Sequence, residues 1–559
     1  MKKKITLLLV VLGLFSVSFA QTTLVPDQFV NAQITGPGVY KVEAGKAYAF
    51  DGRIDLDYEI TIEGPDATWI MEAENPPVLV NTPADNGKAR GFFELKENGA
   101  ITVKNLIFSG MNSNGELSKS FIVNGTGLSM TADNVCFTDY QNWALRNRTK
   151  GESISITNCV FINAYRPSGS RAGGFPIRMD VACDDVLVEN NSVVNSGRLL
   201  ANSGPFDNAT IHEIHNTYLN QSMAGHDQRA IEMLTVNNIF YNYNFLGYKT
   251  DKHSKPDNDY QKHYTTFNYF HQVPDLSQVS LYLGHNLFYN DEEILNWFDT
   301  KGGDSIAQVL LWAPSVDTFI INDDDYTIGP NFAEIDPVFT SHPGNTDKVV
   351  EYMDWFFLTD QSTDMPDWMI ESPVTWSEDG TPVLSWPPAF DLSYSNSGLQ
   401  TAGTDGLPLG DLNWFPDKKA EYLTNKDAFI ASLRDSMVNA QAVYDPETMD
   451  ETPLITEIIT TSVQNLIPGQ FDLSGNYPNP FDQSTTIEFK LPQQATVNLS
   501  IYNMLGRKVF EMTENDLPSG THMINFNASK LSSGIYMYKF NATTINGQKF
   551  VDTKKMIKE

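Results

Sequence analysis

The sequence predicts an all-β protein: a right-handed parallel β-helix, which is a solenoid, followed by a small C-terminal β-sandwich. Three observations predict this fold. A short motif containing Asn-x-x-Phe returns along the first half of the chain, its flanks alternate apolar and polar residues, and residues 471–559 form a separate run of strand-like segments. A chain of 559 residues is also too long for one compact core, which favours several domains or a repeat array.

The N-terminus reads MKKKITLLLVVLGLFSVSFAQ. Lysines at 2–4 precede a mostly apolar run from Ile5 to Val17, and Ser18-Phe19-Ala20 has the small-x-small form of a cleavage site. The apolar run is shorter than the roughly 20 residues that a membrane-spanning helix needs. Residues 1–20 are therefore predicted to be a secretory signal peptide, and no later apolar run is long enough to form a transmembrane span.

The chain carries 69 acidic and 38 basic residues, a formal net charge of −31. This excess of negative charge argues against partners such as nucleic acid or an anionic membrane. Three cysteines, Cys136, Cys159 and Cys183, cannot all pair with one another, although export would permit one disulfide. Their spacing is close to the length of one repeat, so we expect small buried side chains in a core.

The repeat is clearest in ITVKNLIF, MTADNVCF and ISITNCVF, which end at Phe108, Phe137 and Phe161. VLVENNSV and LTVNNIF continue it, and HNTYLN and HNLFYN are weaker copies. The anchoring asparagines are Asn105, Asn134, Asn158, Asn190 and Asn237. A unit of short strands that returns at this interval is typical of a solenoid.

Asparagine suits the bend between strands because it tolerates a left-handed backbone and can bond to its neighbours. We expect such side chains to hydrogen-bond from rung to rung, with Phe and Val filling the interior. An antiparallel sandwich would explain the strand lengths, but not the return of Asn and Phe in one phase. Residues 21–416 are therefore assigned to the β-helix domain.

After residue 290 the repeat weakens, and seven of the nine tryptophans lie in this part. Indole rings either stack on sugars or pack in a core, and both alternatives stay open here. Residues 424–443 are predicted to form a helix, with Thr424 and Asp427 near its cap and Phe429, Leu433 and Met437 on one face. Residues 417–470 are assigned to this helix and a linker.

The C-terminal segment 471–559 alternates apolar and polar residues between turn signals, which predicts the small sandwich. It closely resembles the type A sorting domain of the bacterial type IX secretion system. The matching residues are Asn476-Tyr477-Pro478-Asn479-Pro480-Phe481, Tyr502, Leu505-Gly506-Arg507, Ser533-Gly534-Ile535-Tyr536 and Lys554-Lys555-Met556. The resemblance implies a Bacteroidetes-type source, export through the periplasm, recognition by the secretion machinery, and cleavage by its sortase-like peptidase. The protein would then be released or attached to the outer-membrane surface. The alternative is an adhesive or carbohydrate-binding sandwich.

Arginine is concentrated in one part of the chain. Seven of the 11 arginines lie between residues 146 and 229: Arg146, Arg148, Arg166, Arg171, Arg178, Arg198 and Arg229. Because rungs stack, loops at one corner gather on one side, where guanidinium groups could bind carboxylate or sulfate. The alternative is ion pairing with nearby acids, namely Asp180, Asp184, Asp185, Glu189 and Asp207.

An acidic polysaccharide is the partner that this concentration predicts, and β-elimination is the reaction. That reaction needs a cation to neutralise the uronate carboxylate, a base and an acid. The candidate catalytic residues are Lys249, His226 and Arg229, with Tyr248 as a further base, and the other six arginines are candidates for substrate binding. Calcium held by Asp180, Asp184 and Asp185 is the alternative neutralising group, although their spacing matches no strict calcium loop.

The predicted fold resembles the pectate-lyase-like superfamily of lyases and hydrolases. Cys183-Asp184-Asp185 and Gly225-His226-Asp227 echo two motifs of its polygalacturonase-like hydrolases, but no Asn-Thr-Asp precedes them, which places hydrolysis behind the lyase hypothesis. TAGTDGLPLGDLNWFP at 401–416 resembles the closing segment of uncharacterised β-helix proteins from Bacteroidetes polysaccharide-utilisation loci. Three hypotheses result: a polysaccharide lyase, a non-catalytic glycan-binding protein and a surface adhesin.

Overall fold

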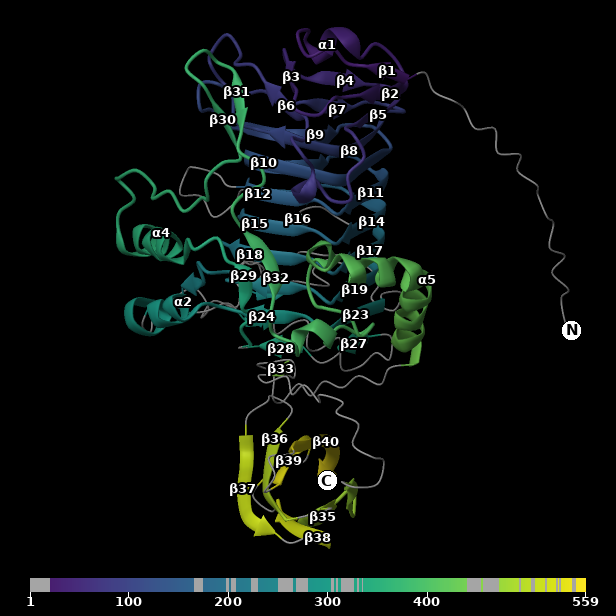
Figure 1. Cartoon of the computed structure of the whole chain (residues 1–559), viewed down its shortest axis with the longest axis vertical. Coiled ribbons are helices and arrows are strands. Elements are labelled where there is room, and N and C mark those ends of the chain that lie inside the picture. Colours follow the sequence, from purple (N-terminus) through teal and green to yellow (C-terminus); the bar gives the residue numbers. More distant parts are fainter. Residues whose placement is uncertain are drawn as a thin grey trace, which may run out of the picture.

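A computed structural model describes residues 21–164, 174–197, 201–202, 208–222, 230–249, 265–267, 280–302, 306–307, 310–312, 326–328, 331–333, 335–439, 454–455, 472–491, 494–503, 508–517, 520–528, 531, 534–544 and 549–558. Stacked parallel strands form most of the described chain, and a separate antiparallel domain follows (Figure 1). The solenoid and the C-terminal sandwich predicted from the sequence are both confirmed.

The solenoid has three faces, each a column of parallel strands. The first face contains β1 (Gln21–Thr23), β2 (Gly38–Lys41), β5 (Glu59–Glu63), β8 (Ala100–Ser109), β10 (Ser129–Asn147), β11 (Gly151–Thr157), β14 (Cys183–Glu189), β17 (Asn208–Ile214), β19 (Ala230–Val236), β23 (Ser280–Gly284) and β27 (Tyr326–Ile328). The second contains β3 (Ala47–Phe50), β6 (Val78–Asn81), β12 (Val160–Ala164), β15 (Ser192–Ser196), β18 (Thr217–Gln221), β20 (Ile239–Tyr241), β24 (Leu287–Tyr289), β28 (Asn331–Ala333) and β33 (Leu454–Ile455). The third contains β4 (Ile54–Leu56), β7 (Phe93–Leu95), β9 (Ser118–Asn124), β13 (Phe175–Met179) and β16 (Ala201–Asn202).

Strand β10 contributes to all three faces, since its successive parts pair with β11, β12 and β13. The chain turns between the first two faces at a residue with positive φ. The predicted asparagines Asn105, Asn134, Asn158, Asn190 and Asn237 have φ between 53° and 61°. His215 and His285 take the same corner in the two weaker repeats, at 54° and 55°. The expected left-handed turn is therefore confirmed in every copy of the motif.

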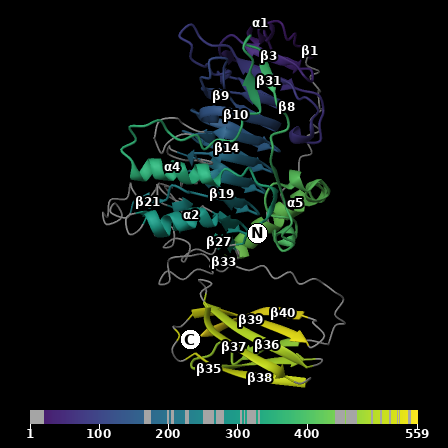
Figure 2. The same cartoon turned by 60° about the vertical axis from the view of Figure 1, so that its left-hand side comes forward.

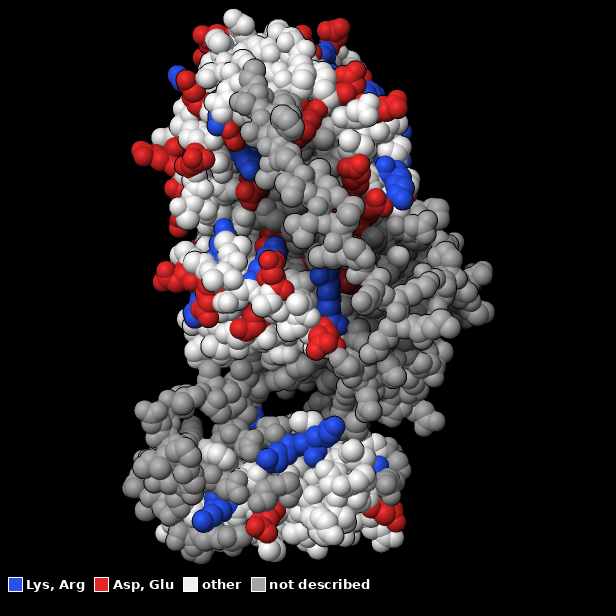
Figure 3. Space-filling view, turned by 90° about the vertical axis from the view of Figure 1, so that its right-hand side faces the viewer, with Lys and Arg blue, Asp and Glu red and all other residues white. Residues whose placement is uncertain are grey.

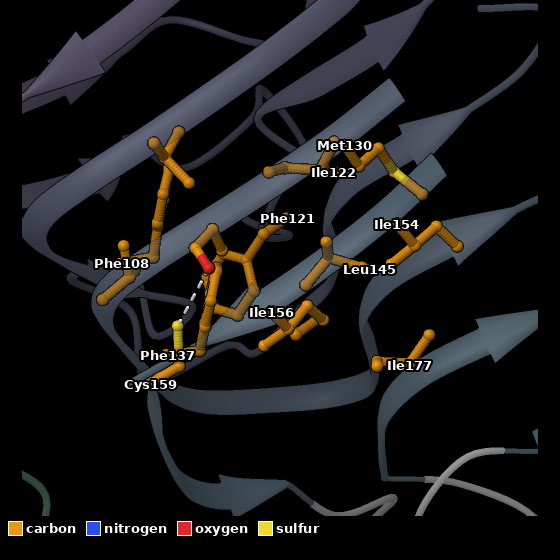
Figure 4. Packing of buried hydrophobic residues seen from close by; sticks show 14 of the residues in the cluster. Phe108, Phe121, Ile122, Met130, Phe137, Leu145, Ile154, Ile156, Cys159 and Ile177 are labelled. Atoms are coloured by element: carbon orange, nitrogen blue, oxygen red, sulfur yellow. Dashed lines mark hydrogen bonds between the residues drawn. The ribbon is translucent and has the colours of Figure 1, made fainter. Parts of the chain in front are cut away.

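Aromatic rings fill the interior as the motif predicts. Phe108 stacks on Phe137 at 5.4 Å between ring centroids, and Figure 4 labels both residues in the interior. Phe137 stacks in turn on Phe161 at 5.1 Å. Further along, Phe240 stacks on Phe288 at 5.1 Å. Because such rings repeat at the strand spacing, each rung buries its apolar face against the next.

The long ladder of side-chain hydrogen bonds between rungs is formed not by the predicted corner asparagines but by asparagines that directly follow a corner. Of the anchoring asparagines, Asn134 donates to Asn105, but a longer ladder is formed by the residue that follows the corner. This ladder consists of five asparagines on successive rungs, and the side-chain amide of each donates to Oδ1 of the asparagine on the next rung at 2.9–3.1 Å. In chain order they are Asn191, Asn216, Asn238, Asn286 and Asn331. Each Oδ1 also accepts the backbone N–H of the asparagine in the preceding rung. This buried ladder therefore satisfies backbone and side-chain groups together.

A second apolar stripe runs along the outside of the second face, and residues 368–415, here called the strap, cover it. Cys136, Val160 and Leu219 belong to the stripe, and they cluster with Leu392 and Tyr394 of the strap. The strap contains β30 (Val374–Trp376), β31 (Pro382–Leu384), β32 (Asp391–Tyr394) and the 3-10 turns η7 (Leu399–Thr401) and η8 (Leu412–Trp414). Figure 1 shows β30 and β31 in green beside the purple and blue N-terminal rungs, so the chain returns along the length of the solenoid.

All three cysteines are buried thiols, as the spacing predicts. Cys136 lies in the outer stripe under the strap, whereas Cys159 and Cys183 lie in the interior. Burial raises the pKa of Cys183 to about 12. These thiols therefore act as small apolar side chains rather than as reactive groups.

The helices lie outside the strand columns. They are α1 (Val30–Gln33), α2 (Glu292–Trp297), α4 (Thr346–Leu358) and α5 (Pro416–Asn439), with a π-helical turn η5 (Phe298–Gly302) after α2. In α5 the predicted face of Phe429, Leu433 and Met437 packs onto the solenoid. The predicted cap at Thr424 is wrong: the helix begins at Pro416, and Thr424 lies inside it with its hydroxyl donating to Ala420. None of the described helices is both long and apolar enough to cross a membrane.

The C-terminal domain has two antiparallel sheets, which Figure 2 shows facing each other. One contains β34 (Asp472–Tyr477), β35 (Ser484–Leu491) and β38 (Gly520–Asn527). The other contains β36 (Ala495–Asn503), β37 (Lys508–Leu517), β39 (Gly534–Thr544) and β40 (Lys549–Lys558). Alternate residues such as Ile487, Leu499 and Phe540 form its core, as the period-two pattern predicts.

Candidate functional site

The third face brings Arg146 and Arg178 together. Strands β10 and β13 pair in parallel with Arg146 opposite Arg178 and Trp143 opposite Phe175. Paired residues on neighbouring parallel strands lie about 4.8 Å apart and point to the same side. Since Leu145 is buried inside and Arg146 is only partly buried, both guanidinium groups point away from the interior.

One carboxylate lies between these two arginines. The Nε of Arg146 donates to Oδ2 of Asp180 at 2.6 Å, and the Nε of Arg178 donates to Oδ1 at 2.6 Å. Burial alone would raise the pKa of Asp180, but the hydrogen bonds and charges of Arg178 and Arg146 outweigh it and hold the pKa below its usual value. Two guanidinium groups thus meet at one carboxylate in a strongly acidic protein.

Trp143 adds an aromatic surface to this group. The Cζ of Arg146 lies 4.2 Å from the centroid of the Trp143 ring, and the Cζ of Arg178 lies 5.4 Å from it. About a quarter of each arginine side chain stays accessible, 24% for Arg146 and 28% for Arg178. We call Trp143, Arg146, Arg178 and Asp180 the arginine cluster. It offers guanidinium donors and a ring face to the same ligand.

The sequence pattern did not identify Trp143 as part of a site. A strict period of two would place residues 143 and 146 on opposite sides of the strand. Here Ala144 and Leu145 are both buried in the interior, and the pairing of β10 with β9 shifts register between Tyr140 and Trp143. This irregularity brings Trp143 and Arg146 to the same side.

The predicted residues Asp184 and Asp185 have partners outside the arginine cluster. Arg148 is exposed just after the end of β10. Asp184 lies 3.4 Å from Lys150, and Oδ1 of Asp185 accepts the hydroxyl of Thr210 at 2.6 Å. Within the described residues, no group of three or more His, Cys, Asp or Glu side chains is placed to hold a metal ion. Calcium binding by Asp180, Asp184 and Asp185 stays a prediction.

Five predicted residues lie outside the described part of the chain: Arg166, Arg171, Arg198, His226 and Arg229. Lys249 ends β21 (Tyr248–Lys249), which pairs antiparallel with β25 (Ile306–Ala307), but its side chain is outside the description. The predicted convergence is therefore seen for Arg146 and Arg178, and it stays a prediction for the others.

The late tryptophans are packing residues wherever their side chains are described. Trp297, Trp355 and Trp368 are buried, the first and third with only 2% exposed. The indole N–H of Trp376 donates to the carbonyl of Met111, and that of Trp386 donates to the carbonyl of Ile70. These contacts fasten the strap to the N-terminal rungs.

The polar residues of segment 401–416 also dock the strap. Asp405 lies 2.8 Å from Nε2 of the buried His215, while Thr404 donates its N–H to Asn237. Asp411 accepts the hydroxyl of Ser192 at 2.8 Å, and Asn413 donates to the carbonyl of Asn190 at 2.8 Å. The residues that make this segment recognisable therefore hold it against the solenoid corner.

The surface around α5 carries both positive and negative side chains. Figure 3 shows basic and acidic side chains interspersed over the described part of the face beside α5. There Arg434 donates from Nε to both carboxylate oxygens of Glu232 at 2.9 Å, and His212 lies 2.6 Å from the same carboxylate. This group joins α5 to β17 and β19.

Comparison with known proteins identifies the C-terminal domain. Residues 476–559 match the family described as "Secretion system C-terminal sorting domain". No curated protein matches the chain. Among solved structures, dimeric latent PorU from Porphyromonas gingivalis is similar at 22% identity, with a TM-score of 0.14, over 16% of this chain and 9% of that one. The PmoD soluble domain from Methylocystis sp. ATCC 49242 (Rockwell) is similar at 19% identity, with a TM-score of 0.11, over 14% of this chain and 76% of that one. Residues 476–559 are a type IX sorting domain, and this protein is exported for secretion or display at the cell surface.

Proposed function

We propose that the exported solenoid binds an acidic polysaccharide through the arginine cluster. One observation carries the proposal: Arg146 and Arg178, on neighbouring rungs, share the single carboxylate of Asp180 over the ring of Trp143. A guanidinium has five N–H donors, and the bonds of Arg146 to Asp180, from its Nε and one of its Nη atoms, leave other donors of Arg146 to bind a ligand. Uronate or sulfate groups are the anions that suit this geometry.

The net negative charge of the protein should restrict where a polyanion can bind. At −31 the protein repels a polyanion over most of its surface, so binding should be confined to a cationic patch. A linear polymer can contact several rungs of a solenoid at once, which multiplies weak contacts. Because the arginines are partly exposed, added salt should weaken the binding.

The test is retardation of the protein in native gels that contain alginate, pectin, a glycosaminoglycan, ulvan or a neutral glucan. We expect retardation by at least one acidic polymer and none by the neutral one. Arg146→Gln should weaken that binding roughly tenfold, equivalent to about 1.4 kcal/mol. The control is Lys418→Gln, which removes one positive charge from an exposed pair with Glu421 on α5. Equal effects of the two substitutions would reject the arginine cluster as the site.

Cleavage by β-elimination is the second candidate function. A pair of guanidinium groups meets its first requirement, because it can neutralise a uronate carboxylate. Lys249, His226 and Tyr248 are the candidate bases, and Arg229 is a further candidate for neutralising the carboxylate. The test is ultraviolet absorbance of unsaturated uronates with the same polymers. Retardation without absorbance would identify a binding protein, and the absence of both would favour an adhesin.

A further inference from the structure

The corner where the strap passes into α5 brings together a lysine, an asparagine and an aspartate. Lys419 lies in the first turn of α5, and its Nζ donates to Oδ1 of Asn413 at 2.6 Å. The Nδ2 of Asn413 in turn donates to Oδ1 of Asp411 at 2.7 Å. Hydrogen bonds therefore link an amine to a carboxamide, and the carboxamide to a carboxyl group.

Asp411 and Asn413 are buried and held from the solenoid side, while Lys419 is half-buried. Asp411 is 1% exposed and Asn413 is 4% exposed. Oδ2 of Asp411 accepts the hydroxyl of Ser192 at 2.8 Å, and Nδ2 of Asn413 donates to the carbonyl of Asn190 at 2.8 Å. Hydrogen bonds that hold the amide and the amine in place favour a reaction between them, since orientation costs little further entropy.

We propose that Lys419 and Asn413 form an intramolecular isopeptide bond, with Asp411 as the group that transfers the proton. This inference concerns a covalent modification and is independent of polysaccharide binding. Two of the three residues, Asp411 and Asn413, lie in the segment whose other polar residues dock the strap.

The reaction balances without an oxidant or a cofactor. The neutral Nζ of Lys419 leaves the plane of the amide and attacks Cγ of Asn413, forming a new C–N bond. Protonated Asp411, whose Oδ1 contacts Nδ2, delivers its proton there, the Cγ–Nδ2 bond breaks, and ammonia departs. The proton that Nζ loses on forming the amide then restores the carboxyl group of Asp411. The ammonium group of Lys419 and the amide of Asn413 thus become one secondary amide and one ammonium ion.

The surroundings favour the protonation states that this step needs. Burial raises the pKa of Asp411 to about 6, although bonds from Asn413 and Ser192 oppose that rise. Burial lowers the pKa of Lys419, against the opposing charges of Asp411, Asp133, Glu189 and Glu72. A protonated carboxyl and a neutral amine are therefore more accessible here than in water.

The test is the intact mass of the full chain after folding, followed by peptide mapping with tandem mass spectrometry. We expect the protein to be lighter than its sequence by one ammonia, with Asn413 and Lys419 in one linked peptide. Chain kept in denaturant from synthesis onward should have the full mass. Hydroxylamine should not cleave the link, which distinguishes it from a succinimide at an Asn-Gly site.

Variants make the test specific. Lys419→Met and Asp411→Asn should keep the full mass, and Asn413→Asp should lose water instead of ammonia. Lys418→Met is the matched control, because Lys418 pairs with Glu421 at 2.8 Å and should leave the ammonia loss unchanged. Wild-type protein of full mass, or an ammonia loss that maps elsewhere, would overturn the proposal even if a variant failed to fold.

Discussion

Asparagine has two different roles at adjacent positions of a rung. Asn190 turns the backbone with φ at 53°, and both of its side-chain polar atoms are buried without a hydrogen-bond partner among the described residues. Asn191, the next residue, donates to Oδ1 of Asn216 and to the carbonyl of Ile156. Asn190 therefore matters because it adopts a positive φ, and Asn191 matters because its side chain forms hydrogen bonds.

This difference predicts a large loss of stability on substitution of the second kind of asparagine and a small change for the first. Asn216→Ala should lower the free energy of unfolding by about 2–4 kcal/mol, because it removes the acceptor of the backbone and side-chain N–H groups of buried Asn191. Asn190→Gly should change it by less than about 0.5 kcal/mol, since glycine accepts positive φ and no side-chain bond is lost. Chemical denaturation of the two variants measures both values. A larger loss for Asn190→Gly would contradict the assignment of roles.

Among the elements, the strap depends on one close approach to the solenoid. Gly410 has φ at +79°, and its N–H donates to the carbonyl of Asn237. A Cβ atom there would lie 2.4 Å from Oγ1 of Thr217 and 2.9 Å from Cδ1 of Ile239. A side chain at this position therefore requires the strap, or the side chains of Thr217 and Ile239, to move.

Gly380 provides a matched control for this contact. It has nearly the same φ, +78°, but nothing lies within 4 Å of its hypothetical Cβ. Gly410→Ala should therefore cost about 1–3 kcal/mol more stability than Gly380→Ala, which carries only the backbone strain. Thermal unfolding followed by circular dichroism gives the comparison. Equal losses would show that the strap can shift away at no cost.

The docking of α5 should depend on pH through Glu232. Burial would raise the pKa of Glu232, but His212 and Arg434 outweigh it and lower the pKa from 4.5 to about 2. A lowered pKa means that the ion pair stabilises the folded state above pH 4.5 and loses this effect as the pH falls toward 2. Wild type should therefore exceed Glu232→Gln by roughly 1 kcal/mol near neutral pH, and this difference should shrink in acid. A pH-independent difference in unfolding free energy would contradict this reasoning.

At the scale of the whole molecule, local patterns predicted the solenoid but not its covering. Period-two alternation and the returning Asn and Phe act within one rung, so they can be seen in a single sequence. The contact from Trp386 to Ile70 joins residues 316 positions apart and has no period. In the sequence, the strap therefore has no periodic pattern; it is marked by the loss of the repeat and by a concentration of tryptophans, with which sugar binding and core packing are both consistent.

The candidate site was predictable in part for the same reason. The count of arginines pointed to the region, and stacking of rungs implied that Arg146 and Arg178 could meet. Their sharing of Asp180, and the position of Trp143, depend on an irregular strand that breaks the alternation. Only the structure shows which acid pairs with which base.

The substitution Asp180→Asn tests most directly whether the arginine cluster binds an acidic polysaccharide. Removing this carboxylate charge weakens its hold on the Arg146 guanidinium, so affinity for the acidic polymer should rise roughly tenfold, about 1.4 kcal/mol. Asp184→Asn is the control, because it makes the same charge change at a residue paired with Lys150. Calorimetric titration of both variants with the polymer that retards the wild type gives the comparison. A rise for Asp180→Asn alone is the predicted result; an unchanged or lower affinity would show that the cluster is a structural ion pair and not a binding site.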